Sequence, residues 1–263
     1  MKEKKTWFRC EDHVGIITMD SPQNLNAIDV GMAEELLEWL DCCEKDPEVH
    51  VAVIRGEGKA FSAGGDVAYL YDRVQRNLPR SSELSERVGR LALTIKTMKK
   101  LVITSVSGSA AGAGANLALS GDFCLAAENA KFIQAFVGIA LVPDTGGAYL
   151  LSRMIGSQRA LELCITGRSL PAAEAHGLGL VYRLCSPETL EEETMKLARC
   201  LARGPLLAYE KIKHQVFSAA FRDYQHYLLE VEEPTLAACA VSEDFKEGVR
   251  AFVEKRRPEF QGK

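Results

Sequence analysis

Short, largely apolar segments recur along the first two-thirds of the chain, and a glycine-rich loop or a helical pattern follows each of them. Residues 51–54, Leu101–Val106 and residues 123–126 are segments of this kind. A strand without polar alternation is expected where both faces of a sheet are covered, as in parallel sheets joined by crossover helices. The alternation of such strands with helices therefore predicts an α/β fold.

The start of the chain and the helical patterns add detail to this prediction. Thr6–Glu11 and Val14–Met19 are expected to be two strands that turn near Asp12 and His13, and Asp29 is an expected helix N-cap. A further helix is indicated by apolar residues three and four positions apart: Leu84, Val88, Leu91, Ile95 and Met98.

The last third of the sequence is mostly helical in pattern. We therefore expect a core of residues 1–200 and a C-terminal helical region of residues 201–263. Between two helical patterns, residues 72–87 are polar and rich in serine and arginine, and we expect a mobile excursion there.

Composition excludes several classes of protein. The chain has 263 residues, 26% charged residues and 47% hydrophobic residues, which is typical of a globular protein rather than a disordered one. Its 32 basic and 36 acidic residues leave a net charge of -4, which disfavours nucleic acid as a partner. The longest apolar runs, such as residues 137–142, are too short to span a bilayer, and the first residues offer no signal-peptide core. We expect a cytoplasmic protein without a membrane partner.

Neither cysteine nor histidine is spaced as in a metal site. The eight cysteines form no Cys-x-x-Cys pair, and several lie in apolar runs, so we expect reduced thiols that pack as small hydrophobic residues. The five histidines show no ligand spacing. No metal site is expected.

Two loops rich in glycine and alanine, residues 62–66 and 108–115, each follow a strand and lead into a helix. The first amides of a helix have no intrahelical partner, so two such loops side by side could present two N–H groups to one oxygen, as in an oxyanion hole. The alternative is that the small residues serve only tight turns and close packing. A dinucleotide site is disfavoured, because the Gly112-x-Gly114 spacing fails beyond the second glycine.

These residues resemble the enoyl-CoA hydratase/isomerase (crotonase) superfamily. The resemblance covers nearly the whole chain and rests on an ordered set of motifs: Phe61-Ser62-Ala63-Gly64-Gly65-Asp66, which is similar to an FxAGxD loop; Gly108 to Asp122; residues 130–147; residues 166–181; and residues 242–256. It implies an α/β fold built as a spiral of ββα units with a helical C-terminal trimerisation region. The assembly implied is a homotrimer or a dimer of trimers. The substrates implied are acyl-CoA thioesters of fatty-acid or aromatic-acid metabolism. No cofactor is implied, since coenzyme A enters only as part of the substrate.

The resemblance also implies roles for individual residues. The amides of Gly65 and Ala113 map to an oxyanion hole that stabilises a thioester enolate. The residues that map to substrate contacts are Ala63, Asp66, Leu70, Asn116 and Phe136, although a helix cap is the alternative for Asp66. Those that map to coenzyme A contacts are Asn26, Ala27, Phe252 and Lys255, the last two from the C-terminal helix of a neighbouring subunit.

The chain departs from the hydratases of this family at two positions. Hydratases carry a glutamate where Asn116 stands and a second one where Phe136 stands. Addition of water needs a group that activates the water and a proton donor, and neither an amide nor a phenyl ring can supply these. Ordinary enoyl-CoA hydratase activity is therefore not expected.

Asp144 is the acid that remains, in the segment from Leu141 to Gly147. From the sequence alone an N-cap is one interpretation. The resemblance favours another, because some enoyl-CoA isomerases, including ring-epoxide phenylacetyl-CoA isomerases, carry their single acidic base at the matching place. An aspartate there can also be a nucleophile, as in 4-chlorobenzoyl-CoA dehalogenases, but these have a tryptophan near the position of Phe136.

The expected function is isomerisation of a 3-enoyl-CoA to a 2-enoyl-CoA, with Asp144 as the acid and base. The alternatives are a ring-epoxide aryl-CoA isomerase, a hydrolase or dehalogenase with Asp144 as nucleophile, and a non-catalytic acyl-CoA-binding protein. Glu232 and Glu233 are expected to lie on a solvated helix face.

Overall fold

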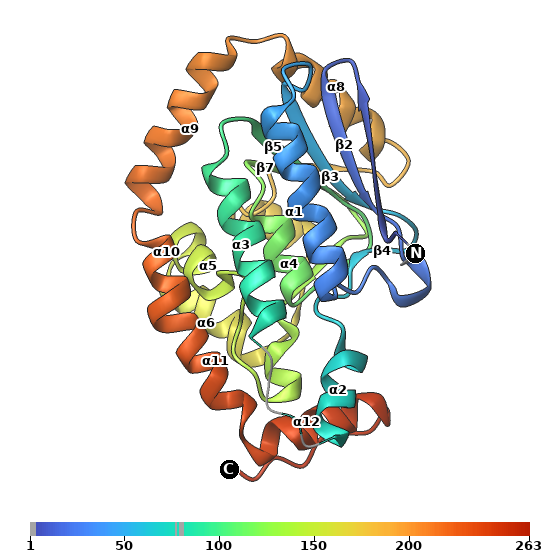
Figure 1. The fold of residues 1–263 in the computed structure, drawn as a ribbon, viewed down its shortest axis with the longest axis vertical. Helices are drawn as coiled ribbons and strands as arrows, with labels where there is room; N and C mark the ends of the chain where they lie inside the picture. The colour runs from blue at the N-terminus through green and yellow to red at the C-terminus, as the bar shows by residue number, and fades with distance from the viewer. Residues whose placement is uncertain (1–3, 77, 79–81) are drawn as a thin grey trace.

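A computed structural model describes residues 4–76, 78 and 82–263. Within these residues the larger sheet has six strands, and Figure 1 shows its central strands beside helix α1 (Val30–Lys45). In spatial order the six strands are β1 (Thr6–Glu11), β2 (Val14–Met19), β3 (Val51–Gly56), β5 (Leu101–Val106), β7 (Phe123–Ala127) and β10 (Arg183–Cys185). β1 and β2 form an antiparallel hairpin, and all later neighbours are parallel. Asp12 and His13, which turn the hairpin, both have positive φ. The two predicted strands are confirmed.

Both faces of this sheet are covered, as the apolar strands predict. Along β3, Ala52 and Ile54 pack into one hydrophobic cluster, whereas Val51 and Val53 pack into another. The first cluster includes residues of α1 (Val30–Lys45) and α3 (Glu83–Thr97), and the second includes residues of α8 (Leu190–Ala202). The apolar strand is thus buried on both sides by helices of the same chain.

A second, four-stranded sheet consists of β4 (Ala60–Ser62), β6 (Ser109–Ala111), β8 (Lys131–Ile133) and β9 (Ser169–Pro171). Each of β3, β5 and β7 is followed by one short strand of this second sheet and then by helix. The chain therefore repeats a ββα unit, which confirms the expected spiral architecture.

The remaining helices connect and cover these units. In chain order they are η1 (Pro22–Asn24), α2 (Val67–Gln75), α4 (Ala113–Leu119), η2 (Ala135–Ile139), α5 (Gly147–Ile155), α6 (Ser157–Thr166), α7 (Ala172–Gly177), α9 (Leu206–Ala220), α10 (Tyr224–Tyr227), η3 (Leu228–Glu232), α11 (Glu233–Ala240) and α12 (Glu243–Val253). The excursion expected at residues 72–87 is shorter than predicted, because α2 continues to Gln75 and α3 begins at Glu83. Of this stretch, residues 77 and 79–81 lie outside the described residues.

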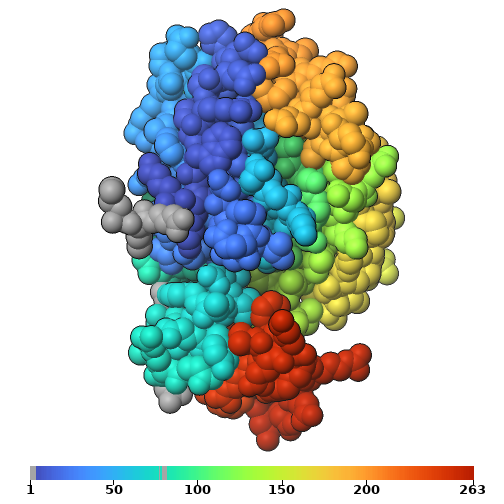
Figure 2. Space-filling view, turned by 90° about the vertical axis from the view of Figure 1, so that its right-hand side faces the viewer, coloured from blue at the N-terminus to red at the C-terminus, as the bar shows by residue number. Residues whose placement is uncertain are grey.

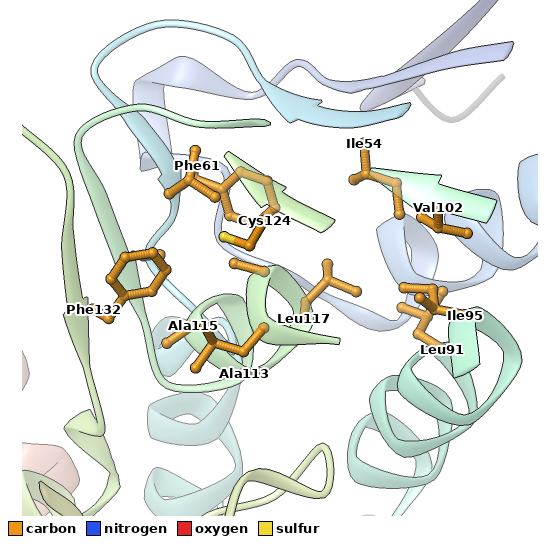
Figure 3. Close-up of a cluster of buried hydrophobic side chains, with 14 of the residues drawn as sticks. Ile54, Phe61, Leu91, Ile95, Val102, Ala113, Ala115, Leu117, Cys124 and Phe132 are labelled. Atoms are coloured by element: carbon orange, nitrogen blue, oxygen red, sulfur yellow. The ribbon is translucent and has the colours of Figure 1, made fainter. Parts of the chain in front are cut away.

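The two glycine-rich loops pack backbone against backbone. A Cβ atom on Gly64, whose φ is +92°, would lie 2.5 Å from the carbonyl oxygen of Ala111. A Cβ atom on Gly114 would lie 2.6 Å from the Cβ of Ser62. Figure 3 shows α4 with Ala113, Ala115 and Leu117 inside the main hydrophobic cluster. The small residues thus let the first turn of α4 approach the 62–66 loop closely.

The C-terminal helices close one end of the molecule. Figure 2 shows α2 beside the C-terminal segment, and α12 packs against both α2 and η2. Their contact is apolar and includes Val74 of α2, Ile139 of η2 and Phe245 of α12. Among the described residues, no helix combines the length and the apolar character that crossing a membrane requires.

Candidate active site

A cavity of about 350 Å³ lies between the two glycine-rich loops and the C-terminal helices. Its walls are mainly apolar and include Leu84 of α3, Phe136 and Ile139 of η2, and Leu236 of α11. Among the described residues that line it, Asp144 is the one with a carboxylate. An apolar cleft with a few convergent polar groups is typical of a small-molecule site.

Two backbone amides face this cavity without an internal partner. Gly65 and Ala113 both line it, and within the described part of the chain neither N–H donates a hydrogen bond. Gly65 is held by a bridge to Ile28, in which the neighbouring Gly64 and Asp66 make the bonds. Two fixed donors of this kind can stabilise an oxygen that becomes negatively charged, because they need no reorganisation during the reaction.

Asp144 lies in the segment between η2 and α5, and its side chain is half-buried. Its Oδ1 accepts a hydrogen bond from the Thr145 hydroxyl over 2.7 Å. Gly146, not Asp144, occupies the N-cap position of α5. The N-cap interpretation of Asp144 therefore does not describe the observed helix start.

The turn that follows Asp144 is strained. Thr145 has φ of +59° and Gly146 has φ of +70°. A β-branched residue rarely adopts a positive φ, and such a conformation costs about 1–3 kcal/mol and persists only where the surroundings enforce it. Here the Tyr224 hydroxyl donates to the Thr145 carbonyl over 3.1 Å, and the Gly146 amide donates to Glu232 Oε2 over 2.9 Å.

Glu232 is buried, so the expectation that it lies on a solvated helix face is wrong. Only 5% of it is exposed, because it packs beneath the Asp144–Gly147 segment at the end of η3. Burial, followed by the negative charge of Asp144, raises the pKa of Glu232 to about 9. The position of Glu232 matters for the site because its carboxyl group interacts electrostatically with that of Asp144.

Asn116 and Phe136, the two positions that the resemblance maps to hydratase glutamates, have different surroundings. Phe136 lines the cavity, and its ring lies close to Gly112. Asn116 is buried and does not line the cavity. Its Nδ2 donates to the backbone carbonyl of Asp144 over 2.8 Å, and its Oδ1 accepts from Gln134 Nε2 over 2.8 Å. Asn116 thus holds the backbone of Asp144 in place.

The other expected site residues divide into two groups. Ala63, Leu70 and Phe252 line the cavity together with Asp144, Gly65 and Ala113. Phe252 reaches the cavity of its own chain. The lining residues do not include Asp66, whose carboxylate caps α2 by accepting from the Ala68 amide over 2.9 Å.

The remaining three residues, mapped to coenzyme A contacts, also lie outside the cavity lining. Asn26 is fully buried, and its side chain bonds to the backbone of Ser21, Glu57 and Ala60. Ala27 is buried, and Lys255 is exposed beyond the end of α12.

Sequence reasoning missed several residues that shape the site. The lining residues that it did not single out include Leu84, Ser85, Thr166, Gly167 and Leu236. Leu84 already belonged to a predicted apolar helix face, so its position was indicated although its role was not.

Comparison with protein-family models matches residues 9–263 to the enoyl-CoA hydratase/isomerase family. The chain belongs to this family, which confirms the superfamily indicated by the motifs.

Several relatives match nearly the full length of the chain. A trans-2-decenoyl-[acyl-carrier-protein] isomerase of Streptococcus mutans is 38% identical, with 100% of both chains covered. A 1,2-epoxyphenylacetyl-CoA isomerase of Escherichia coli is 37% identical, covering 96% of this chain and 97% of the relative. The crystal structure of an enoyl-CoA hydratase from Mycobacterium avium subsp. paratuberculosis superposes with a TM-score of 0.89 at 31% identity, covering 98% and 99% of the two chains.

Proposed function

We propose that this chain is an isomerase that moves a double bond of an enoyl thioester between the 3,4 and 2,3 positions, with Asp144 as its acid and base. One observation carries the proposal. Asp144 is the one carboxylate among the described cavity-lining residues, and it shares that cavity with the unpaired amides of Gly65 and Ala113. The family's other two acid positions hold Asn116 and Phe136.

The proposed reaction needs a single base. The Asp144 carboxylate removes a proton from C2 of a 3-enoyl thioester, and the electron pair moves to the thioester oxygen. The Gly65 and Ala113 amides hold this oxygen while it is negatively charged, and each donor of this type contributes about 10²–10³ in rate. The protonated Asp144 then returns its proton to C4, which leaves the double bond between C2 and C3.

The walls of the cavity support this assignment. Leu84, Phe136 and Ile139 are apolar, and they exclude water from an enolate that would otherwise be solvated. An apolar wall also disfavours the charged form of a carboxylate, which suits a base that must hold a proton and then release it.

The names of the relatives support a thioester carried by coenzyme A or by an acyl carrier protein. They also provide a second candidate, the isomerisation of an epoxidised aromatic-ring CoA ester, which is the reaction in the name of the Escherichia coli relative. Asp144 and the same two amides would serve either reaction. A panel of 3-enoyl thioesters on both carriers, together with a ring-epoxide CoA ester, distinguishes the two candidates by relative kcat/KM.

The decisive variant is Asp144→Asn, assayed with the best 3-enoyl thioester. We expect kcat to fall more than about 100-fold, while the Kd of a saturated acyl thioester stays close to that of the unaltered protein. Asp46→Asn is the matched control, because Asp46 also accepts a local hydrogen bond, from the amide of Glu48, and does not line the cavity. If Asp144→Asn keeps more than about a tenth of kcat, a barrier change of only ~1.4 kcal/mol, Asp144 is not the base.

A further inference from the structure

One peptide unit next to Asp144 is held at both of its polar ends by the C-terminal segment. The carbonyl of Thr145 and the N–H of Gly146 belong to the same peptide bond. The Tyr224 hydroxyl donates to that carbonyl, and Glu232 Oε2 accepts from that N–H. Both partners are buried, with Tyr224 fully enclosed and Glu232 only 5% exposed. The orientation of the Thr145–Gly146 peptide is therefore set by residues about 80 positions later in the chain.

This peptide needs such partners because the backbone conformation around it is unfavourable. Both Thr145 and Gly146 lie in the left-handed region, and Thr145 is β-branched. If Glu232 were lost, the Gly146 N–H would be buried without an acceptor, and rotation of the peptide would relieve both problems. The rotation would also move Thr145, whose hydroxyl donates to Asp144 Oδ1 over 2.7 Å, and would so disturb the hydrogen bond that orients the Asp144 carboxylate.

Glu232 lies in a π-helical segment, η3, between α10 and α11. The wider turn of a π-helix displaces a side chain from the regular helical position, and such segments are often found at functional sites. The neighbouring Glu230, on the same segment, points to solvent. One of the two glutamates is thus directed inward to the turn after Asp144.

The charged and titratable groups around Glu232 come from every element packed against it. Asp144 and Glu233 raise its pKa further after burial, whereas backbone hydrogen bonds from Gly146 and Thr145 lower it. Burial, followed by the charge of Glu232, raises the pKa values of the phenols of Tyr224 and Tyr227. On the α3 side, Glu86 and Arg90 line a small cavity with it. With a pKa of about 9, Glu232 keeps its proton at neutral pH, which leaves Asp144 beside an uncharged neighbour.

We propose that Glu232 is a positioning residue, which clamps the Thr145–Gly146 peptide and so directs the Asp144 carboxylate into the cavity that the Gly65 and Ala113 amides line. This inference rests on the proposed role of Asp144 as acid and base. Glu232 touches neither substrate nor reacting atoms, since it lies outside the cavity lining. It acts through the backbone that follows Asp144 and through its own charge state.

The test compares Glu232→Ala, Glu232→Gln and the control Glu230→Gln, with kcat and KM measured from about pH 6 to about pH 10. Glu232→Ala removes the acceptor of the Gly146 amide, and we expect kcat to fall about 10²-fold with KM within about threefold, because a base displaced by about 1 Å loses rate rather than binding. Glu232→Gln keeps an acceptor oxygen and is expected to recover most of that loss near pH 7. Glu230→Gln should follow the unaltered protein throughout.

The pH profile separates this role from a purely structural one. In the unaltered protein, kcat should decline above about pH 9, when Glu232 ionises and places a second negative charge beside Asp144. In Glu232→Gln that decline should be absent, since glutamine does not titrate. A kcat for Glu232→Ala within about threefold of normal, or an alkaline decline that persists unchanged in Glu232→Gln, overturns the inference. If Glu232→Ala does not fold, Glu232→Gln carries the test.

A measurement that needs no turnover tests the inference independently of the proposed function. The ¹³C carboxyl resonance of Asp144, followed by NMR, should show a second titration step near pH 9 that vanishes in Glu232→Gln. A protein that isomerises no enoyl thioester but shows this coupled step contradicts the proposed function and leaves the contact between the two carboxyl groups intact. Absence of the coupled step in the unaltered protein contradicts the inference, whatever the activity.

Discussion

The side-chain amide of Asn116 donates a 2.8 Å hydrogen bond to the backbone carbonyl of Asp144. The residue that the resemblance maps to a hydratase glutamate therefore directs its donor to the backbone of Asp144. Its amide oxygen is occupied as well, by the Gln134 side chain. Asn116 contributes to the site through the placement of Asp144.

Hydration of crotonyl-CoA should be very slow. Asn116 is engaged by Asp144 and Gln134, and Phe136 presents a phenyl ring. The described residues that line the cavity therefore offer one carboxylate, where hydration needs both an activated water and a proton donor. The measurement is the loss of absorbance of the conjugated thioester in water. A hydration kcat within about tenfold of the ~10 s⁻¹ typical of enzymes would contradict the assignment.

Gly146→Ala should destabilise the protein more than Gly179→Ala. Both glycines have positive φ, +70° and +81°, so the backbone cost for alanine, about 1–2 kcal/mol, is common to the two variants. A Cβ on Gly146 would also lie 2.0 Å from the Tyr224 hydroxyl, whereas a Cβ on Gly179 meets nothing within 4 Å. Urea denaturation gives the two free energies of unfolding. Equal losses would show that the turn can move away from Tyr224 at no cost.

The stability gained by Glu232→Gln should grow with pH. Glu232 has its folded-state pKa raised from 4.5 to about 9, so between these values the folded protein retains a proton that the unfolded chain has lost. The free energy of unfolding therefore falls as pH rises through this window, with a limiting slope of about 1.4 kcal/mol per pH unit for one proton. Glutamine does not titrate and escapes this loss. Denaturation at about pH 5 and about pH 8 gives the free energies of unfolding of both proteins. The value for Glu232→Gln should rise relative to that of the unaltered protein between these two pH values. The same difference at both would contradict the assigned burial of Glu232.

The protein should form a trimer or a dimer of trimers. Helix α9 carries apolar side chains that this chain leaves exposed, among them Leu207 at 69%, Ile212 at 54% and Val216 at 57%. Exposed apolar surface of this kind is often covered by another subunit. Light scattering at micromolar concentration measures the mass, for which the chain contributes 28.9 kDa. A mass of one chain would contradict the prediction, and Ile212→Glu should shift the equilibrium toward smaller species.

The parts of the fold that depend on neighbouring residues could be predicted from the sequence. The β1–β2 hairpin and the cap of α1 by Asp29, which accepts from the Met32 amide, are local features with local signals. The two glycine-rich loops are local as well, and the positions of Gly65 and Ala113 followed from the motifs that contain them.

Glu232 could not be predicted in the same way. Its partner, the Gly146 amide, is 86 residues away, and Tyr224 contacts Thr145 across 79 residues. A pair of glutamates before a proline looks like a solvated helix face, and only the packing of η3 and α10 against the start of α5 makes one of them an internal group. Long-range packing decides burial, and burial decides the charge of this residue.

The two amides proposed to form an oxyanion hole come from successive turns of the ββα spiral, one after β4 and one after β6, which are adjacent parallel strands. Their separation therefore follows from the stagger between these strands, which pair Ala60 with Ser109 and Ser62 with Ala110 around an irregularity. The cavity walls from α2, α3 and the C-terminal helices belong to other parts of the chain. If the proposed site holds the substrate, exchange of wall residues such as Leu84 or Leu236 should change the substrate range, while the spacing of the two donors stays as the sheet sets it.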